Sequence, residues 1–152
     1  GSRGLGDVYK RQIYQSEEAY FADFCRMQEI IFEQTGEYAK LVRFPGGSSN
    51  TVSHFNPGIM TRLTNDLNDM GYAYFDWNVS AADTASDATR YTVIENFKES
   101  VPKHDYSVVL QHDTNAFSVD AVEEILSWGI KNGYSFRALN LTSPAVHHSV
   151  AN

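Results

Sequence analysis

Three short segments of this chain each carry an apolar stretch to a polar or glycine-bearing stop, and a stretch with helical spacing follows each one. The segments are RFPGG (Arg43 to Gly47), DWNVSAAD (Asp76 to Asp83) and VVLQHD (Val108 to Asp113). Parallel α/β folds have this pattern, because their strands carry side chains to one rim and the loops after the strands hold the functional site. The pattern therefore predicts an α/β fold with an arginine, aspartates and a histidine on that rim.

Apolar spacing predicts four helices and four strands. Ser16 is expected to cap a helix that Gly36 ends, Asn56 and Pro57 to begin a second, and Ser118 to cap the fourth. The third expected helix covers 91–101, and the expected strands cover 41–44, 73–79, 106–111 and 134–139. Helices that alternate with strands imply a parallel sheet with right-handed crossovers. A sheet of only four strands leaves edges open, so we expect a part of a larger sheet or barrel, or a chain that self-associates.

The composition excludes several classes of protein. The chain has 152 residues, of which 42% are hydrophobic and 20% charged, enough for one compact domain. Its net charge of -7 argues against a nucleic-acid partner, because no basic face is available for phosphate. No apolar run approaches the roughly 18 residues that span a bilayer. The single cysteine excludes an internal disulfide.

Residues 1–12 (GSRGLGDVYKRQ) do not fit the rest of the chain. They have no apolar period and hold three of the ten glycines. The run GLGDVYKRQ is similar to translated adapter sequence at the ends of assembled metagenomic fragments. We therefore expect 1–12 to be a foreign, unstructured segment and 13–152 to hold the domain. Its glycines are not expected to bind phosphate, because no strand precedes them and no GK[ST] follows.

Arg43 and the turn after it form the first candidate site. An arginine inside an apolar strand is costly unless a carboxylate pairs with it. Arg43 either bonds to a loop carbonyl or orients a catalytic carboxylate or a developing oxyanion. The turn of Pro45, Gly46 and Gly47 favours the second interpretation, because its backbone can approach a substrate oxygen closely.

The other candidates follow the second and third segments. His112 ends a strand, and its pKa range suits a general acid for a leaving amine, although a lone histidine is often structural. Asp76 either faces solvent or pairs with Arg43 or His112. The choice between a bland and a functional interpretation is equally undecided for Asp83. Trp77 is either a core residue or a platform for a sugar. No complete metal site is visible, because the five histidines show neither HxxxH nor HExxH spacing.

In order and spacing, these segments resemble the polysaccharide deacetylase family, the NodB-homology carbohydrate esterases, over about 13–152. RFPGG is similar to the third motif of the family, DWNVSAAD to the fourth and LQH to the fifth. The resemblance implies the C-terminal portion of a distorted (β/α) barrel. It also implies a divalent metal, usually zinc, and the removal of acetyl groups from N-acetylated sugars of chitin or peptidoglycan. An extracellular or cell-envelope location follows from the same resemblance.

The resemblance also assigns roles to single residues. Arg43 would orient the catalytic-base aspartate, the amide of Gly46 would help to bind the oxyanion, and Leu110 would line the acetyl pocket. His112 would be the general acid, and the fourth-motif aspartate would support it. The candidate catalytic residues are Arg43, His112, Asp83 and Asp76. The candidate substrate-binding residues are Pro45, Gly46, Trp77 and Leu110.

The chain departs from the family pattern in two ways. The first motif (TFDDG-like, with the base and one metal ligand) and the second (HSxxH-like, with the metal histidines) are absent, so no metal ligand is assigned and the chain alone is expected to be inactive. In the fourth motif, Ser80 takes the position of the first aspartate and Thr84 that of the tryptophan, while Asp83 is retained.

Two alternatives to a deacetylase remain open at this point. One is a non-catalytic domain that binds a glycan or a protein through exposed aromatic residues such as Tyr72, Tyr74 and Tyr91. The other is a flavodoxin-like module in which Arg43 and His112 are structural. The flavodoxin-like module requires that all four strands form one self-contained sheet.

Overall fold

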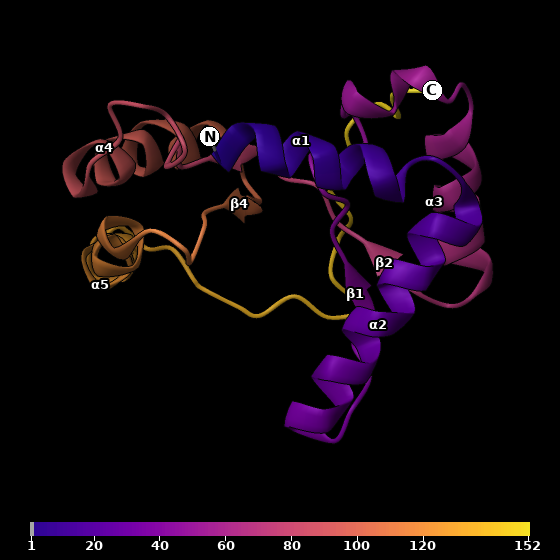
Figure 1. Ribbon diagram of the computed structural model, residues 1–152. Helices are drawn as coiled ribbons and strands as arrows, with labels where there is room; N and C mark the ends of the chain where they lie inside the picture. The colour runs from indigo at the N-terminus through magenta and orange to yellow at the C-terminus, as the bar shows by residue number, and fades with distance from the viewer. Residues whose placement is uncertain (1) are drawn as a thin grey trace. The chain divides into compact units, whose positions relative to one another are not determined.

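The computed structural model describes residues 2–152, and side chains from residue 6 onward. Helices alternate with short parallel strands (Figure 1), as the sequence predicts. The chain divides into two compact units, Gly1–Asp76 with Leu139–Asn152, and Trp77–Ala138. Each unit has its own apolar core. Within the described part of the chain, no helix combines the length and the apolar character needed to cross a membrane.

The first unit pairs two strands and covers them with helices. β1 and β2 are parallel, with Leu41 opposite Ala73, and the core between the helices and strands is rich in aromatic and aliphatic side chains. The elements are α1 (Ser2–Ile13), α2 (Glu17–Thr35), β1 (Leu41–Val42), the 3-10 helix η1 (Val52–Phe55), α3 (Ile59–Asp69) and β2 (Ala73–Tyr74).

Local signals decide where α2 and α3 begin. The Ser16 hydroxyl accepts the Ala19 N–H at 3.0 Å, and Gly36 ends α2 at φ 77°, so both predicted ends are confirmed. α3 begins after Gly58 instead of at Asn56, where the sequence predicts its start. The side chain of Asn56 is used elsewhere, because it donates to the carbonyls of Tyr14 and Gln15 at 3.1 and 2.9 Å.

The N-terminal segment is helical, so the expectation of an unstructured stretch is wrong for residues 2–12. Tyr9 and Ile13 lie one turn apart and therefore share a face of α1. The hydroxyl of Tyr9 donates to Asp23 of α2 at 2.5 Å, and Ile13 is buried in the core. These contacts give the segment a partner that its composition did not reveal. Its foreign origin stays a prediction.

The second unit repeats the same arrangement. β3 and β4 are parallel, with Val79 opposite Val109. α4 packs against α5 (Figure 1), and their apolar faces enclose Val93, Phe97 and Ile125. The elements are β3 (Val79–Ser80), α4 (Arg90–Ser100), the 3-10 helix η2 (Val101–Lys103), β4 (Val109–Leu110) and α5 (Ala116–Lys131).

All four strand predictions differ from the structure: β1 and β4 are shorter than the expected 41–44 and 106–111, and the other two strands differ more strongly. The expected strand 73–79 is divided into β2 and β3, and 134–139 forms no strand. Aromatic packing explains the second difference, because Tyr134 stacks on Trp128 at 5.6 Å and Phe136 stacks on Phe97 at 6.3 Å. In the described residues the strands form two separate parallel pairs. This is not the single four-stranded sheet that a flavodoxin-like module requires.

Candidate functional site

A buried carboxylate and a half-exposed imidazole meet in the second unit. Asp83 follows β3 and His112 follows β4, and the residues after neighbouring parallel strands lie at the same edge. Oδ1 of Asp83 lies 2.8 Å from Nδ1 of His112, and Oδ2 accepts the backbone N–H of His112 at 2.5 Å. The carboxylate therefore holds this histidine by its ring and by its main chain.

A third bond to the same carboxylate comes from α5. The hydroxyl of Ser118, which is fully buried, donates to Oδ2 of Asp83 at 2.7 Å. The prediction that Ser118 caps α5 is wrong, because Asn115 occupies the cap position. The Asn115 side chain donates to the carbonyl of Asp83 at 3.0 Å. The start of α5 is thus tied to Asp83 by side chains at two positions, a contact that the local sequence did not reveal.

The charge state of Asp83 follows from these contacts. Burial alone would raise the pKa of Asp83, but the hydrogen bonds from the His112 backbone, the His112 ring and the Ser118 hydroxyl outweigh it and hold the pKa below its ordinary value. An ionised carboxylate only accepts hydrogen bonds, so Nδ1 of His112 is the donor. The His112 side chain is 40% exposed and that of Asp83 only 2%, so a ligand can reach the imidazole but not the carboxylate.

The backbone just before Asp83 is strained. Ala82 has φ 53°, in the left-handed region, and it is the single non-glycine residue with a positive φ in the described part of the chain. This conformation costs a residue with a Cβ of the order of 1–3 kcal/mol, and such strain clusters at functional sites. The Ser80 hydroxyl accepts the N–H of Ala82 at 3.1 Å, which stabilises the turn.

Asp76 lies in the first unit and has a different environment. Its side chain is fully buried, so the interpretation as a solvent-facing aspartate is wrong. Its carboxylate accepts the Ser48 N–H at 2.8 Å, the Ser48 hydroxyl at 2.5 Å and the His148 N–H at 2.9 Å. Asp76 thus ties the loop after β1 to the C-terminal segment. The sequence signal was available only in part, because nothing marked Ser48 or His148 as its partners.

Arg43 is an electrostatic neighbour of Asp76. Partial desolvation lowers the pKa of Arg43, and the carboxylate of Asp76 acts in the opposite direction. The Nε atom of Arg43 also donates to the carbonyl of Phe75 at 3.4 Å. Both expected environments, a carboxylate and a loop carbonyl, are therefore present beside this arginine.

The turn after Arg43 depends on two glycines. Gly46 and Gly47 have φ 79° and 82°, which L side chains rarely adopt. The Gly47 N–H donates to the Phe44 carbonyl at 2.7 Å, and the Pro45 carbonyl accepts the Tyr14 hydroxyl at 2.8 Å. No acceptor for the exposed Gly46 N–H is found among the described residues. This amide is thus free to bind a ligand.

The remaining candidates have simple environments. Leu110 is half-buried in β4, where its carbonyl accepts the Ala81 N–H at 2.9 Å, and Trp77 is also half-buried. Of the aromatic residues expected to be exposed, Tyr91 is exposed, but Tyr74 is buried and stacks on His147 at 3.9 Å. Tyr72 packs edge-on against Phe24. The surface available for sugar stacking is therefore smaller than the sequence suggested.

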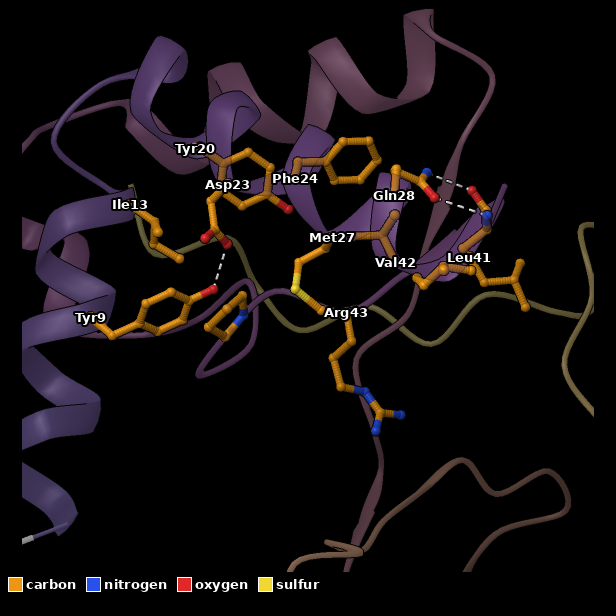
Figure 2. A pocket seen from close by; sticks show the side chains of 13 residues that line it. Tyr9, Ile13, Tyr20, Asp23, Phe24, Met27, Gln28, Leu41, Val42 and Arg43 are labelled. Carbon is orange, nitrogen blue, oxygen red and sulfur yellow. Dashed lines mark hydrogen bonds between the residues drawn. The ribbon is translucent and has the colours of Figure 1, made fainter. Parts of the chain in front are cut away.

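The first unit also contains an apolar pocket of about 270 Å³ between α1, α2 and β1. Figure 2 shows Tyr20 and Phe24 at its wall, with the Arg43 guanidinium pointing away from both rings. Gln28 exchanges two hydrogen bonds with the backbone of Ala39, at 2.8 and 2.9 Å (Figure 2). The pocket is lined by residues of the first unit, whereas Asp83 and His112 belong to the second.

The described residues do not fit the metal that the resemblance implies. Among residues 2–152 there is no group of three or more His, Cys, Asp or Glu side chains that could hold a metal ion. A zinc site needs three or four such ligands. The second unit offers an imidazole with its carboxylate, and the turn after β1 in the first unit offers a backbone donor.

Known proteins similar to this chain share one activity in their names. The chain is 26% identical over 142 residues to YheN of Bacillus subtilis (strain 168), which is named as a polysaccharide deacetylase (90% of this chain, 47% of that protein). It is 29% identical over 132 residues to a peptidoglycan-N-acetylglucosamine deacetylase of Bacillus cereus (84% and 45%). The chain spans about half the length of these curated relatives. No protein-family model matches it.

Solved structures agree with the sequence comparison. The catalytic domain of a peptidoglycan N-acetylglucosamine deacetylase from Eubacterium rectale matches with a TM-score of 0.91 at 50% identity, over 94% of this chain and 66% of that one. A polysaccharide deacetylase from Bacillus cereus matches with a TM-score of 0.65 at 28% identity, over 80% and 57%. The chain therefore fits the C-terminal part of a polysaccharide deacetylase of the NodB-homology type, and the solved catalytic domains that it matches are (β/α) barrels.

Proposed function

We propose that this chain supplies the proton-donating half of a deacetylase that removes N-acetyl groups from a glycan such as peptidoglycan. The observation that carries the proposal is the Asp83–His112 pair, a buried carboxylate 2.8 Å from the Nδ1 atom of an accessible imidazole. The relatives named as peptidoglycan deacetylases support the substrate class.

His112 acts as the general acid in this proposal. When the bond between the acetyl carbon and the amide nitrogen breaks, the leaving amine takes a proton from the imidazolium, which becomes neutral. The ionised Asp83 stabilises the imidazolium and fixes its Nδ1 as a donor, so that Nε2 faces the substrate. Positioned acids of this kind contribute typically 10²–10⁴-fold to a rate.

In the same proposal, the other candidate residues bind the substrate or orient catalytic groups. The free amide of Gly46, beside Pro45, donates to the developing oxyanion, and Arg43 orients the catalytic base. Leu110 lines the acetyl pocket and Trp77 contacts the sugar. Asp76 acts indirectly, since its hydrogen bonds fix the loop that follows Gly46 and Gly47.

The base and the divalent metal that the resemblance implies are assigned to residues that this sequence does not contain. Among the described residues, no group of side chains fits that metal. It follows that the chain alone releases no acetate. The proposed location is the cell envelope or the outside of the cell, where the named substrate of the relatives is found. Self-association through uncovered strand edges is a further part of the proposal.

A chimera tests the proposal. The part of the Eubacterium rectale catalytic domain that this chain does not match would be fused in front of Ile13, and acetate release from N-acetylated peptidoglycan would be measured. We expect activity from the chimera, none from the 152-residue chain, and a loss of 10²-fold or more with His112→Ala. A chimera that folds but releases no acetate from any acetylated glycan would contradict the proposal. Glycan binding without acetate release would favour the non-catalytic alternative.

A further inference from the structure

We infer that Ser118 is a positioning residue for His112 and that it acts through the carboxylate of Asp83. The inference deepens the proposed function and rests on it for the role of His112 as a general acid. The geometry itself does not depend on activity. Ser118, Asp83 and His112 all belong to the second unit.

The carboxylate of Asp83 is held at three points. Its Oδ2 accepts two hydrogen bonds, one from the His112 N–H at 2.5 Å and one from the Ser118 hydroxyl at 2.7 Å. Its Oδ1 is left to face Nδ1 of the ring at 2.8 Å. The two donors to Oδ2 come from different elements, the segment after β4 and the first turn of α5. Together they prevent the carboxylate from rotating about its bond to Cβ, so only Oδ1 is presented to the ring.

In the described part of the chain, the hydroxyl of Ser118 is neither a helix cap nor bonded to a second partner. Asn115 is the residue before α5, and the only hydrogen bond that the Ser118 hydroxyl makes within residues 6–152 is to Asp83. Inside a helix serine is less favourable than alanine, and a buried hydroxyl costs free energy unless it is hydrogen-bonded. A fully buried serine at this position is thus stabilised by Asp83.

A second contact fixes the backbone of Ser118 beside the histidine. The side chain of Gln111 donates to the Ser118 carbonyl at 2.6 Å. Gln111 directly precedes His112, so the segment after β4 is hydrogen-bonded both to the Asp83 carboxylate and to the backbone of Ser118. The same segment therefore holds the imidazole and the residue that orients its partner.

The test measures the tautomer of the His112 imidazole. In the wild-type chain, the bond to Asp83 holds neutral His112 as the Nδ1–H tautomer, which ring ¹⁵N and ¹³C chemical shifts report at a pH where histidine is neutral. Ser118→Ala is expected to convert this single tautomer into a mixture in which the Nε2–H form is detectable. Ser118→Thr, which keeps the hydroxyl, is expected to restore the single form. Asp83→Asn is the positive control and should also abolish it.

Ser107→Ala is the matched control. Its hydroxyl is buried in the same unit but has no hydrogen-bond partner among the described residues, so its removal should leave the tautomer unchanged. The inference is overturned when Ser118→Ala keeps the wild-type tautomer while Asp83→Asn changes it. If Ser118→Ala does not fold, Ser118→Cys carries the test, because a thiol of similar size donates weakly. A single Nδ1–H tautomer in that variant would equally overturn the inference.

The outcome is separable from that of the proposed function. The tautomer needs neither a substrate nor any residue outside this chain. An inactive chimera with a serine-dependent tautomer would refute the deacetylase proposal and leave the positioning role intact. An active chimera with a serine-independent tautomer would support the deacetylase proposal and refute the positioning role of Ser118.

Discussion

Asp83 and His112 are 29 positions apart in the sequence, yet Oδ1 of the aspartate lies 2.8 Å from Nδ1 of the histidine. The parallel pairing of β3 and β4 brings them together, because each residue follows the carboxyl end of its strand. The pair joins a group that stays ionised to a group that ligands can reach. Its effects on stability and on local conformation can be measured without an assay of activity.

Asp83 is expected to make the free energy of unfolding depend on pH in the acid range. Its pKa is lower in the folded chain than its ordinary value of 3.8, so the unfolded chain binds the proton more tightly. The stabilisation is therefore complete above about pH 4 and is lost as the pH falls through the folded pKa. Asp83→Asn should lower the free energy of unfolding at pH 7. Below pH 4, the free energy of this variant should decrease less steeply with falling pH than that of the wild type, as measured by urea denaturation.

The control for this prediction is Asp113→Asn. Asp113 is exposed, and no described residue forms a hydrogen bond with its side chain. This variant should follow the wild type at every pH. Parallel acid curves for Asp83→Asn and the wild type would contradict the prediction.

Asp76 is expected to be important for the stability of the first unit. Asp76→Ala leaves the buried N–H and hydroxyl of Ser48 and the N–H of His148 without their acceptor. Leaving buried donors unpaired should cost about 3 kcal/mol of the free energy of unfolding. The measurement is urea denaturation together with the hydrogen exchange of the Ser48 amide, which should become faster. Asp69→Ala, at an exposed position, should change the free energy by less than about 0.5 kcal/mol. Equal effects of the two variants would refute this role of Asp76.

The sequence predicted best what local signals determine. Ser16 and Gly36 delimit α2 because a hydroxyl cap and a left-handed glycine act within one turn of the helix. The strand ends that carry Arg43, Asp83 and His112 were also found, since apolar runs with polar stops are visible along the chain. These signals were sufficient for the fold class, and the roles of the candidate residues stay predictions.

The predictions that were wrong concern residues whose structure depends on contacts between distant segments. The helix of residues 2–13 is supported by the bond from Tyr9 to Asp23, and the stretch after Gly133 packs its aromatic rings on helices instead of forming a strand. Ser118 has the residue type of a helix cap, but a carboxylate 35 positions away accepts its hydroxyl. No pattern along the chain distinguishes a serine that caps a helix from one that binds a distant aspartate.

Because Ala82 is strained, glycine substitutions at two alanines of the same loop are expected to change the free energy of unfolding in opposite directions. Ala82→Gly removes the left-handed penalty at φ 53° and should raise the free energy of unfolding by about 1 kcal/mol. Ala85 lies in the same loop and has a negative φ. There, Ala85→Gly only increases the freedom of the unfolded chain and should lower the free energy by about 0.4–1 kcal/mol. Thermal and urea denaturation of both variants give the comparison, and a loss of stability in both would show that Ala82 is not strained.

The C-terminal segment is expected to cap α3 from a distance. Gly58, which precedes α3, has no side chain to serve as a cap, and Asn152 takes its place. Its Oδ1 accepts the Met60 N–H at 3.0 Å, and its backbone oxygen accepts the Thr61 N–H at 2.9 Å. Loss of a side-chain cap costs typically about 1 kcal/mol, so Asn152→Ala should lower the free energy of unfolding by about that amount.

Hydrogen exchange separates this cap from a general loosening of the unit. In Asn152→Ala the amide of Met60 should exchange faster, while the amide of Thr61 keeps its acceptor because the backbone oxygen of residue 152 remains. Ser149→Ala, at an exposed position in the same segment, is the matched control and should leave both amides protected. Equal acceleration at Met60 and Thr61 would mean that the whole segment has detached, and unchanged exchange at Met60 would refute the cap. The expected difference between two adjacent amides thus tests the position of a single side-chain oxygen.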